Sequence, residues 1–438
     1  MALLWLALSC TAGAAQSSAG AEACRLQVLT SFPESFFHPF VELFSAASNA
    51  TVCVTNKNTI SLLRHVQENR LPAPDVIWAS SPVAFAVLDA EGMLVHRPDK
   101  VRPAADFSGI EVDDPNGSRF GFALSHMGVM WKQRADDDLP KRLDELAAPG
   151  YAGKLGISSP ARSGTTHLFV ETILQEFGWD AGWALLSRIG ANVATVTARS
   201  FGVRDGVAKD RFQLGVGIDF LAKAEGRGQP PLGFAPLSPH VVFPASAGIF
   251  IAGENNPLSE AFIDFLRSEA GQNLLLRPDI ARIPVAPALW SQAGFAADPD
   301  PARPLDMRHA ARRLPVVTAL FDEMITYRHT ELAELWSAVD RFAGDERIGR
   351  SQTMRALLAD VRDLLESVPV ASFMSDADEL VALLARGTAE RMRDLRTAEG
   401  TDLRDSWSRD FSSRFRKARE IVARIDAYLG AQAERTAP

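Results

Sequence analysis

The 438-residue sequence is poor in cysteine and tyrosine, with three of each, and it has no surplus of positive charge. Its net charge of −8 leaves no basic excess to neutralise phosphates, which excludes a typical nucleic-acid-binding protein. Beyond the N-terminus, no apolar run approaches the roughly 18 residues that a membrane-spanning helix needs. With 47% hydrophobic and 23% charged residues, the chain can bury a substantial core, which excludes disorder over its whole length.

The sequence also lacks the motifs of common catalytic and cofactor sites. It contains no Gly-x-Ser-x-Gly, no His-Glu-x-x-His and no Gly-x-Gly-x-x-Gly, and the glycines before Lys154 have the wrong spacing for a Walker loop. Its eight histidines are scattered, and the cysteines have no nearby histidines that could complete a zinc site. We therefore expect a protein that is not an enzyme and that carries no cofactor or metal.

The N-terminus has the pattern of a secretory signal peptide. Residues 2–8 form a short apolar run, and small residues follow it up to Ala23. Ala12–Ala14 and Ala21–Ala23 both fit the small-x-small cleavage rule, although no Lys or Arg precedes the apolar run. Cys10 follows a weak lipobox, so a lipid anchor is the alternative. We predict a signal peptide over residues 1–23 and export to the periplasm.

Cys24 and Cys53 are then the only cysteines of the mature chain. Each lies at or in a predicted strand, and neighbouring parallel strands can bring two such residues within bonding range. Because a cysteine pair in an exported protein is typically a disulfide, we predict a Cys24–Cys53 bond. Two free thiols are the alternative.

Strand and helix patterns alternate over the first 300 residues, which predicts an α/β fold with parallel strands and helices on both faces. Two apolar stretches, residues 120–130 and 241–251, are expected to cross between two lobes. The first lobe is predicted to comprise residues 24–125 and 246–304, and the second residues 126–245. The predicted strands are Leu26–Thr30, Val52–Val54, Asp75–Ala79, Lys154–Ile157, Val193–Val196 and Gly215–Ile218.

From about residue 305 the strand patterns disappear. Only five of the 30 glycines lie after residue 300, the density of charged residues rises, and apolar residues recur at helical spacing, as at Leu357, Val361 and Leu365. We predict a helical extension of about four helices over residues 305–438. The change in composition also predicts that this extension can be separated from the two lobes.

Polar residues gather where predicted strands end, and parallel α/β sheets bind ligands at that edge. The strongest cluster, Ser158–His167, lies between a strand and a helix start, where hydroxyls, free backbone N–H groups and Arg162 favour an anion. An ordinary capped helix with a polar loop is the alternative. Arg162 and Arg199 are the predicted cationic contacts, because each follows a strand and stands beside serines. The predicted ligand-binding residues are Ser31, Ser80, Ser81, Ser158, Ser159, Arg162, Ser163, Thr165, Thr166, His167, Arg199, Ser200 and Asp219.

A family resemblance is carried mainly by the second predicted lobe, and its segments are Ser158–Glu171, Gly178–Trp183, Ala198–Val203, Ser80–Pro82 and Ile283–Pro287. Together with the signal peptide and the two α/β lobes, they make the chain resemble a bacterial periplasmic solute-binding protein of ABC-type uptake systems. Within that family it is most similar to the regulatory type that serves phosphoglycerate uptake. The resemblance implies a type II binding-protein fold that captures a small phosphorylated or carboxylated anion by lobe closure.

The same resemblance implies a membrane partner, either a permease or the outer domain of a sensor kinase, while the binding protein itself is expected to be a monomer. The related ferric-ion-binding branch uses adjacent tyrosines, whereas Tyr151, Tyr327 and Tyr428 are far apart here, which disfavours iron. The competing hypothesis is an exported phosphoester hydrolase. That activity would need a nucleophile or a set of metal ligands, and the sequence offers neither.

Overall fold

The computed structural model describes residues 23–107, 109–132, 139–225, 230–295, 304–391 and 399–436. The predicted signal peptide therefore lies outside the described residues, except for residue 23. In the part that is described, no helix combines the length and the apolar character needed to cross a membrane. The strands are β1 (Leu26–Thr30), β2 (Val52–Asn56), β3 (Val76–Ala79), β4 (Phe120–Trp131), β5 (Leu155–Ser158), β6 (Val193–Thr197), β7 (Leu214–Ile218), β8 (Gly233–Pro236), β9 (Val242–Ile249) and β10 (Ile283–Pro284).

These strands form one mixed sheet in the order β2-β1-β3-β9-β4-β7-β5-β6, with β8 and β10 paired to β4. The helices beside it are α1 (Glu34–Ser48), α2 (Thr59–Gln67), α3 (Pro82–Ala90), α4 (Gly164–Phe177), α5 (Trp179–Ala191), α6 (Ser200–Ala208), α7 (Asp219–Lys223), α8 (Pro257–Arg267) and α9 (Glu269–Leu274). The alternation of strand and helix predicted from the sequence is confirmed.

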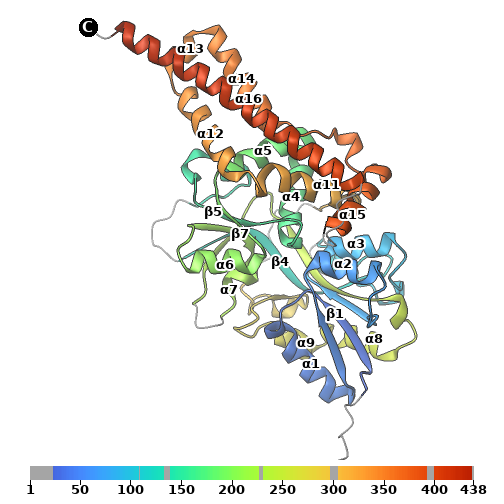
Figure 1. Ribbon diagram of the computed structural model, residues 1–438. Coiled ribbons are helices and arrows are strands. Elements are labelled where there is room, and N and C mark those ends of the chain that lie inside the picture. Colours follow the sequence, from blue (N-terminus) through green and yellow to red (C-terminus); the bar gives the residue numbers. More distant parts are fainter. Residues whose placement is uncertain are drawn as a thin grey trace, which may run out of the picture.

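The long strands β4 and β9 connect two halves of the sheet. Residues 120–126 of β4 pair with β9, whereas residues 127–131 pair with β7 and β8. We call the half with β1, β2, β3 and β9 the first lobe, and the half with β5, β6, β7 and β8 the second lobe (Figure 1). The exact lobe boundaries drawn from the sequence stay a prediction.

The first lobe begins with a parallel β-α-β-α-β unit, because β1 pairs in parallel with both β2 and β3. Its core is aromatic. Phe36, Phe40 and Phe44 recur every four residues on α1, so they form one buried face of that helix. This face packs against Trp78 on β3 and Phe122 on β4. The start of α1 is thereby fixed beside the carboxyl end of β1.

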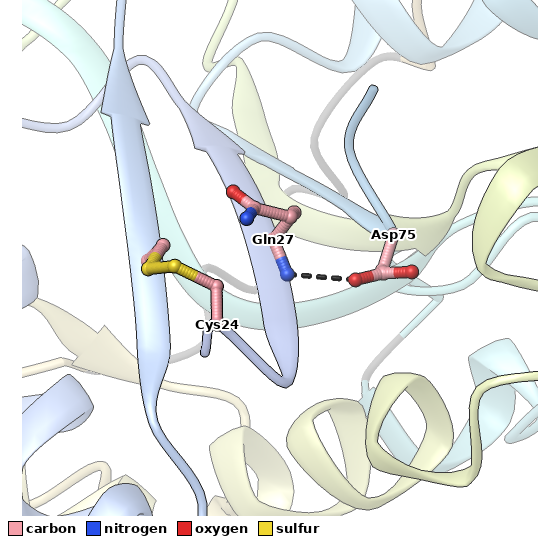
Figure 2. The surroundings of a disulfide bond; sticks show 4 residues. Cys24, Gln27 and Asp75 are labelled. Atoms are coloured by element: carbon pink, nitrogen blue, oxygen red, sulfur yellow. Dashed lines mark hydrogen bonds between the residues drawn. A yellow bond between two sulfur atoms is a disulfide. The ribbon is translucent and has the colours of Figure 1, made fainter. Parts of the chain in front are cut away.

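The predicted disulfide is confirmed, and it closes the edge of the first lobe (Figure 2). Cys24 precedes β1 and Cys53 lies in β2, with their Cα atoms 5.7 Å apart. On the other side of β1, the amide of Gln27 donates to the Asp75 carboxylate at 2.7 Å (Figure 2). The first strand of the fold is therefore fixed covalently on one side and by hydrogen bonding on the other.

The C-terminal region is helical, as predicted, and we call residues 304–436 the extension. Its helices are α10 (Met307–Arg312), α11 (Leu314–Phe321), α12 (His329–Ala343), α13 (Glu346–Arg350), α14 (Gln352–Glu366), α15 (Asp378–Arg391) and α16 (Glu399–Thr436), with a π-helical turn at Asp322–Thr326. In Figure 1 the orange and red helices of the extension cover α4 and α5 of the second lobe. The predicted stripe of Leu357, Val361 and Leu365 is buried.

The separability of the extension stays a prediction, and the structure weighs against it, because the extension and the second lobe share one hydrophobic core. Trp179 on α5 donates its indole N–H to the Val370 carbonyl at 2.8 Å, and Ser187 donates to the Leu365 carbonyl at 2.7 Å. The composition changes near residue 300, but apolar residues from both sides of that point pack into one core.

Candidate functional site

A cavity of about 570 Å³ lies between the two lobes, and its wall contains residues from both. Ser31, Asn58 and Ser80 line it from the first lobe, whereas Ser163 and Ser200 line it from the second. All five follow the carboxyl end of a strand, the edge at which open α/β sheets bind ligands. The volume is that of a small-molecule site.

Several helices begin at this cavity. The wall contains first-turn or N-cap residues of α1, α2, α4 and α6. The first amides of a helix have no acceptor within that helix, and the helix dipole places partial positive charge at the same end. Four such ends around one small volume favour a ligand with negative charge.

The start of α4 shows how closely the two lobes approach each other. The Ser163 hydroxyl caps α4 by accepting from the Thr166 amide at 3.2 Å, and it lies 2.7 Å from the Ser200 hydroxyl. Position 164 must be glycine in this arrangement, since an added Cβ would lie 2.7 Å from the Ser81 Cβ of the first lobe. Gly164 thus allows the two lobes to approach each other closely at the α4 N-terminus.

Cationic side chains supply further positive charge. Lys57, Arg162 and Arg199 line the cavity, and both of these arginines are exposed. In the described part of the chain, neither Arg199 nor Lys57 forms an ion pair, and Arg162 has only a longer-range interaction with Asp322. Asp205, the carboxylate that could have paired with an arginine here, lines the same cavity without such a contact. These cations are therefore available to an anion.

The cavity wall brings together seven of the residues predicted from the sequence: Ser31, Ser80, Arg162, Ser163, Thr165, Arg199 and Ser200. They follow the ends of four strands, β1, β3, β5 and β6, and come from both lobes. Ligand contact by these residues stays a prediction.

The remaining predicted residues do not line this cavity. Ser81 is buried at the start of α3, where it faces Gly164. Ser158 makes a hydroxyl–hydroxyl contact of 2.5 Å with Thr166, which stabilises the turn into α4. Ser159 points to the extension and donates to the Asp322 carboxylate at 2.8 Å.

His167 and Asp219 are also absent from the wall. His167 is 1% exposed, and its Nε2 lies 3.6 Å from a carboxylate oxygen of Glu171 on the buried side of α4. Asp219 begins α7, accepts from the Phe220 amide at 2.9 Å and lies 3.6 Å from His126. Both residues support the elements that form the cavity.

Sequence reasoning missed other residues of the wall, above all Lys57, Asn58 and Arg282. Lys57 and Asn58 follow β2 as directly as Ser31 follows β1, so the strand-end rule could have identified them. Arg282 follows no strand end and gave no such signal. The wall residues include no histidine or cysteine, and the described residues contain no cluster of three or more potential metal ligands.

Comparison with known proteins places this arrangement in a family. Residues 33–277 match the family described as bacterial extracellular solute-binding protein. The phosphoglycerate transport regulatory protein PgtC of Salmonella typhimurium is 32% identical over 347 residues, which cover 78% of this chain and 79% of that protein. The corresponding protein of Salmonella typhi matches equally well.

Solved structures share the fold at low sequence identity. The periplasmic binding protein AfuA from Actinobacillus pleuropneumoniae, solved with fructose-6-phosphate, is 14% identical with a TM-score of 0.56 and covers 72% of this chain and 98% of its own. The ferric binding protein from Campylobacter jejuni is 14% identical with a TM-score of 0.58 and covers 68% and 98%. The type II periplasmic binding protein fold expected from the sequence is confirmed, with the helical extension added to it. The chain belongs to the bacterial extracellular solute-binding protein family.

Proposed function

We propose that this protein captures a small phosphorylated acid by closing its two lobes around it, without bond chemistry. The observation that carries the proposal is the set of four helix N-termini, serine hydroxyls and unpaired cations around one cavity of about 570 Å³. The Salmonella relatives are named for phosphoglycerate transport, and AfuA was solved with a sugar phosphate. The phosphate would lie at the α4 N-terminus, beside Ser163–Thr165, Arg162 and Arg199.

We also propose that the protein acts in the periplasm, after removal of its signal peptide, and reports to a membrane partner. The Cys24–Cys53 disulfide supports an oxidising compartment. The partner would be a permease or the outer domain of a sensor kinase. The extension favours the sensor kinase, because it contacts both lobes and would register their movement.

A ligand screen tests the proposed function. Thermal unfolding would be measured with 3-phosphoglycerate, phosphoenolpyruvate, fructose 6-phosphate, inorganic phosphate and ferric ion. A ligand present at 100 times its dissociation constant stabilises the folded state by roughly 2.7 kcal/mol, which is a clear shift in melting temperature. Stabilisation by phosphorylated acids supports the proposal. Stabilisation by ferric ion alone, or turnover of a phosphoester, would replace it with another function.

Arginine variants test the site itself. Arg162→Ala or Arg199→Ala should weaken binding of the stabilising ligand by roughly 2–5 kcal/mol, because a bidentate charged contact is lost. The apo melting temperature should stay unchanged, since both side chains are exposed and the guanidinium of Arg199 has no partner among the described residues. Arg142→Ala is the matched control, because Arg142 is exposed and pairs with Asp144 away from the cavity.

Calorimetry would measure the ligand affinities of the two arginine variants and of the Arg142→Ala control. If both arginine variants bind the ligand as tightly as Arg142→Ala does, the charged contact is assigned to the wrong residues. Binding would then depend on backbone N–H groups and hydroxyls at Ser163–Thr165.

A further inference from the structure

Arg282 is buried in the cavity wall without a counter-ion. It directly precedes β10 and is 2% exposed. Its Nε and Nη1 atoms have no hydrogen-bond partner, and no carboxylate of the described residues lies within ion-pair distance. Burial lowers the pKa of Arg282 to about 9, although the charge of Asp219 opposes this shift, so the side chain is cationic at neutral pH.

Aromatic rings from both lobes surround this guanidinium. Its Cζ lies 3.7 Å from the ring centroid of Phe220 on α7, and 4.9 Å from the centroids of Phe32 and Phe36 at the start of α1. Cation–π contacts of this kind orient the flat group, but the rings offer no conventional hydrogen-bond acceptor. Two buried N–H donors of this wall residue are therefore left without an acceptor in the described chain.

Two other arginines with little exposure have polar partners in the chain. Arg267 also lies over a ring, that of Phe120 at 5.5 Å, but its Nη2 pairs with an Asp113 carboxylate oxygen at 2.8 Å. Arg204, in the wall of the same cavity, donates to the Leu221 carbonyl at 3.0 Å. Arg282 feels the charge of Asp219 but has no ion pair with it, and a buried cation without an ion pair is unfavourable, so an anionic ligand would stabilise it.

We propose that Arg282 binds a second anionic group of the ligand, one that the α4 N-terminus does not hold. This inference rests on the proposed function, because it takes the phosphate to lie beside Ser163–Thr165. A flat carboxylate suits this position, since it can accept two parallel N–H bonds from a guanidinium that the three rings hold in place. The ligand class is then a small phosphate ester that also carries a carboxylate.

Two probes that differ in one group test the assignment. 3-Phosphoglycerate and glycerol 3-phosphate both carry a phosphate, but only the first carries a carboxylate. Calorimetry should show that the wild-type protein binds 3-phosphoglycerate at least about 30-fold more tightly. Arg282→Met should bind both probes with similar affinity. Arg282→Lys should regain only part of the preference, because an ammonium group cannot make the bidentate contact.

Arg267→Met is the matched control, since it removes a buried arginine that has a carboxylate partner. It should lower the apo melting temperature and leave the ratio of the two affinities unchanged. Arg282→Met should keep or raise the apo melting temperature, because it removes an unpaired buried charge.

Two results would overturn the assignment: Arg282→Met keeps the wild-type preference for 3-phosphoglycerate, or it loses apo stability as Arg267→Met does. If the wild-type protein binds neither probe, the phosphate-ester function fails. The ligand-free melting temperatures of Arg282→Met and Arg267→Met then still show whether Arg282 is a structural residue.

Discussion

A buried charge cluster on α4 explains why His167 serves the fold instead of the cavity. Glu171 is completely buried and pairs with Arg313 of the extension, whose Nη2 lies 2.6 Å from its carboxylate. Burial disfavours the charged form of His167 and lowers its pKa to about 4, with Arg313 adding to the effect and Glu171 opposing it. His167 is therefore neutral at pH 7, and protonation of this residue opposes folding.

This cluster predicts a loss of stability in mild acid. The pKa of His167 is about 6.5 in the unfolded chain and about 4 in the folded protein. Below pH 6.5 the unfolded state takes up a proton that the folded state does not, so stability falls as the pH drops from 6.5 to 4. The full effect is about 3 kcal/mol.

Urea unfolding of His167→Phe between pH 7 and pH 4 checks this expectation, because the variant keeps a ring but cannot be protonated. Its stability should fall less steeply with acid than that of the wild-type protein. Equal pH slopes for the two proteins would contradict the assignment, whatever their absolute stabilities.

Individual residues of the cavity wall could be predicted from the sequence where they lie between the end of a strand and the start of a helix. Ser163 and Arg162 follow a strand and precede a helix, and both line the cavity. His167 was included because it is near in sequence, but it lies about 200° around the helix from Thr165. Arg282 could not be found, because its surroundings are made by rings that come from distant parts of the chain.

At the level of elements, β2 is an edge strand that the disulfide links to the residue preceding β1. It pairs only with β1 in the described sheet. An edge strand with one neighbour depends on few contacts, so a covalent link across it limits the freedom of the unfolded chain.

Removal of this bond should therefore be costly. Cys24 and Cys53 are 29 positions apart, a loop whose closure stabilises the folded state by about 3–4 kcal/mol in the chain-entropy description. The Cys24→Ser/Cys53→Ser double variant should unfold at a lower urea concentration than the oxidised wild-type protein. Reduction with dithiothreitol should lower the wild-type midpoint and leave the double variant unchanged. Equal midpoints for oxidised and reduced wild-type protein would contradict the expectation.

At the level of elements, periodicity predicted most strands and helices, but not the direction of the crossing strands. β4 runs antiparallel to β7, β8 and β9, which makes the sheet mixed instead of parallel. The hydrophobic pattern of a buried strand is the same in either direction. The direction of β4 relative to its neighbours depends on how the chain passes from one lobe to the other, which the hydrophobic pattern does not encode.

For the whole molecule, the main feature is an extension that touches both lobes. In the first lobe, α10 contacts α3, and Leu314 belongs to a cluster with Leu63 and Leu88. In the second lobe, α11 and α12 cover α4 and α5. Asp322 joins the extension to the loop before α4 through Ser159, and burial raises the pKa of its carboxyl group. The extension is thus attached to the cavity loop and to both bodies that move on closure.

For the whole molecule, we predict that the two lobes do not fold stably without the extension. A chain ending at Pro304 would expose the apolar faces of α4 and α5 and leave Glu171 without Arg313. Removing one partner of a buried ion pair is destabilising by roughly 3–5 kcal/mol, and the lost apolar contacts add to that. The truncated chain should therefore melt at a much lower temperature or aggregate, and bind a hydrophobic dye.

A point substitution at Asp322 tests the role of the extension even if the truncated chain does not fold. Asp322→Asn weakens the hydrogen bonds from Ser159 and from Thr326 without removing the extension, because an amide accepts a hydrogen bond less strongly than a carboxylate. It should leave the extension docked but reduce ligand affinity, since Arg162 lies on the loop that Ser159 anchors. A truncated chain with wild-type melting temperature and wild-type affinity would show instead that the shared core is dispensable and that the extension only serves the membrane partner.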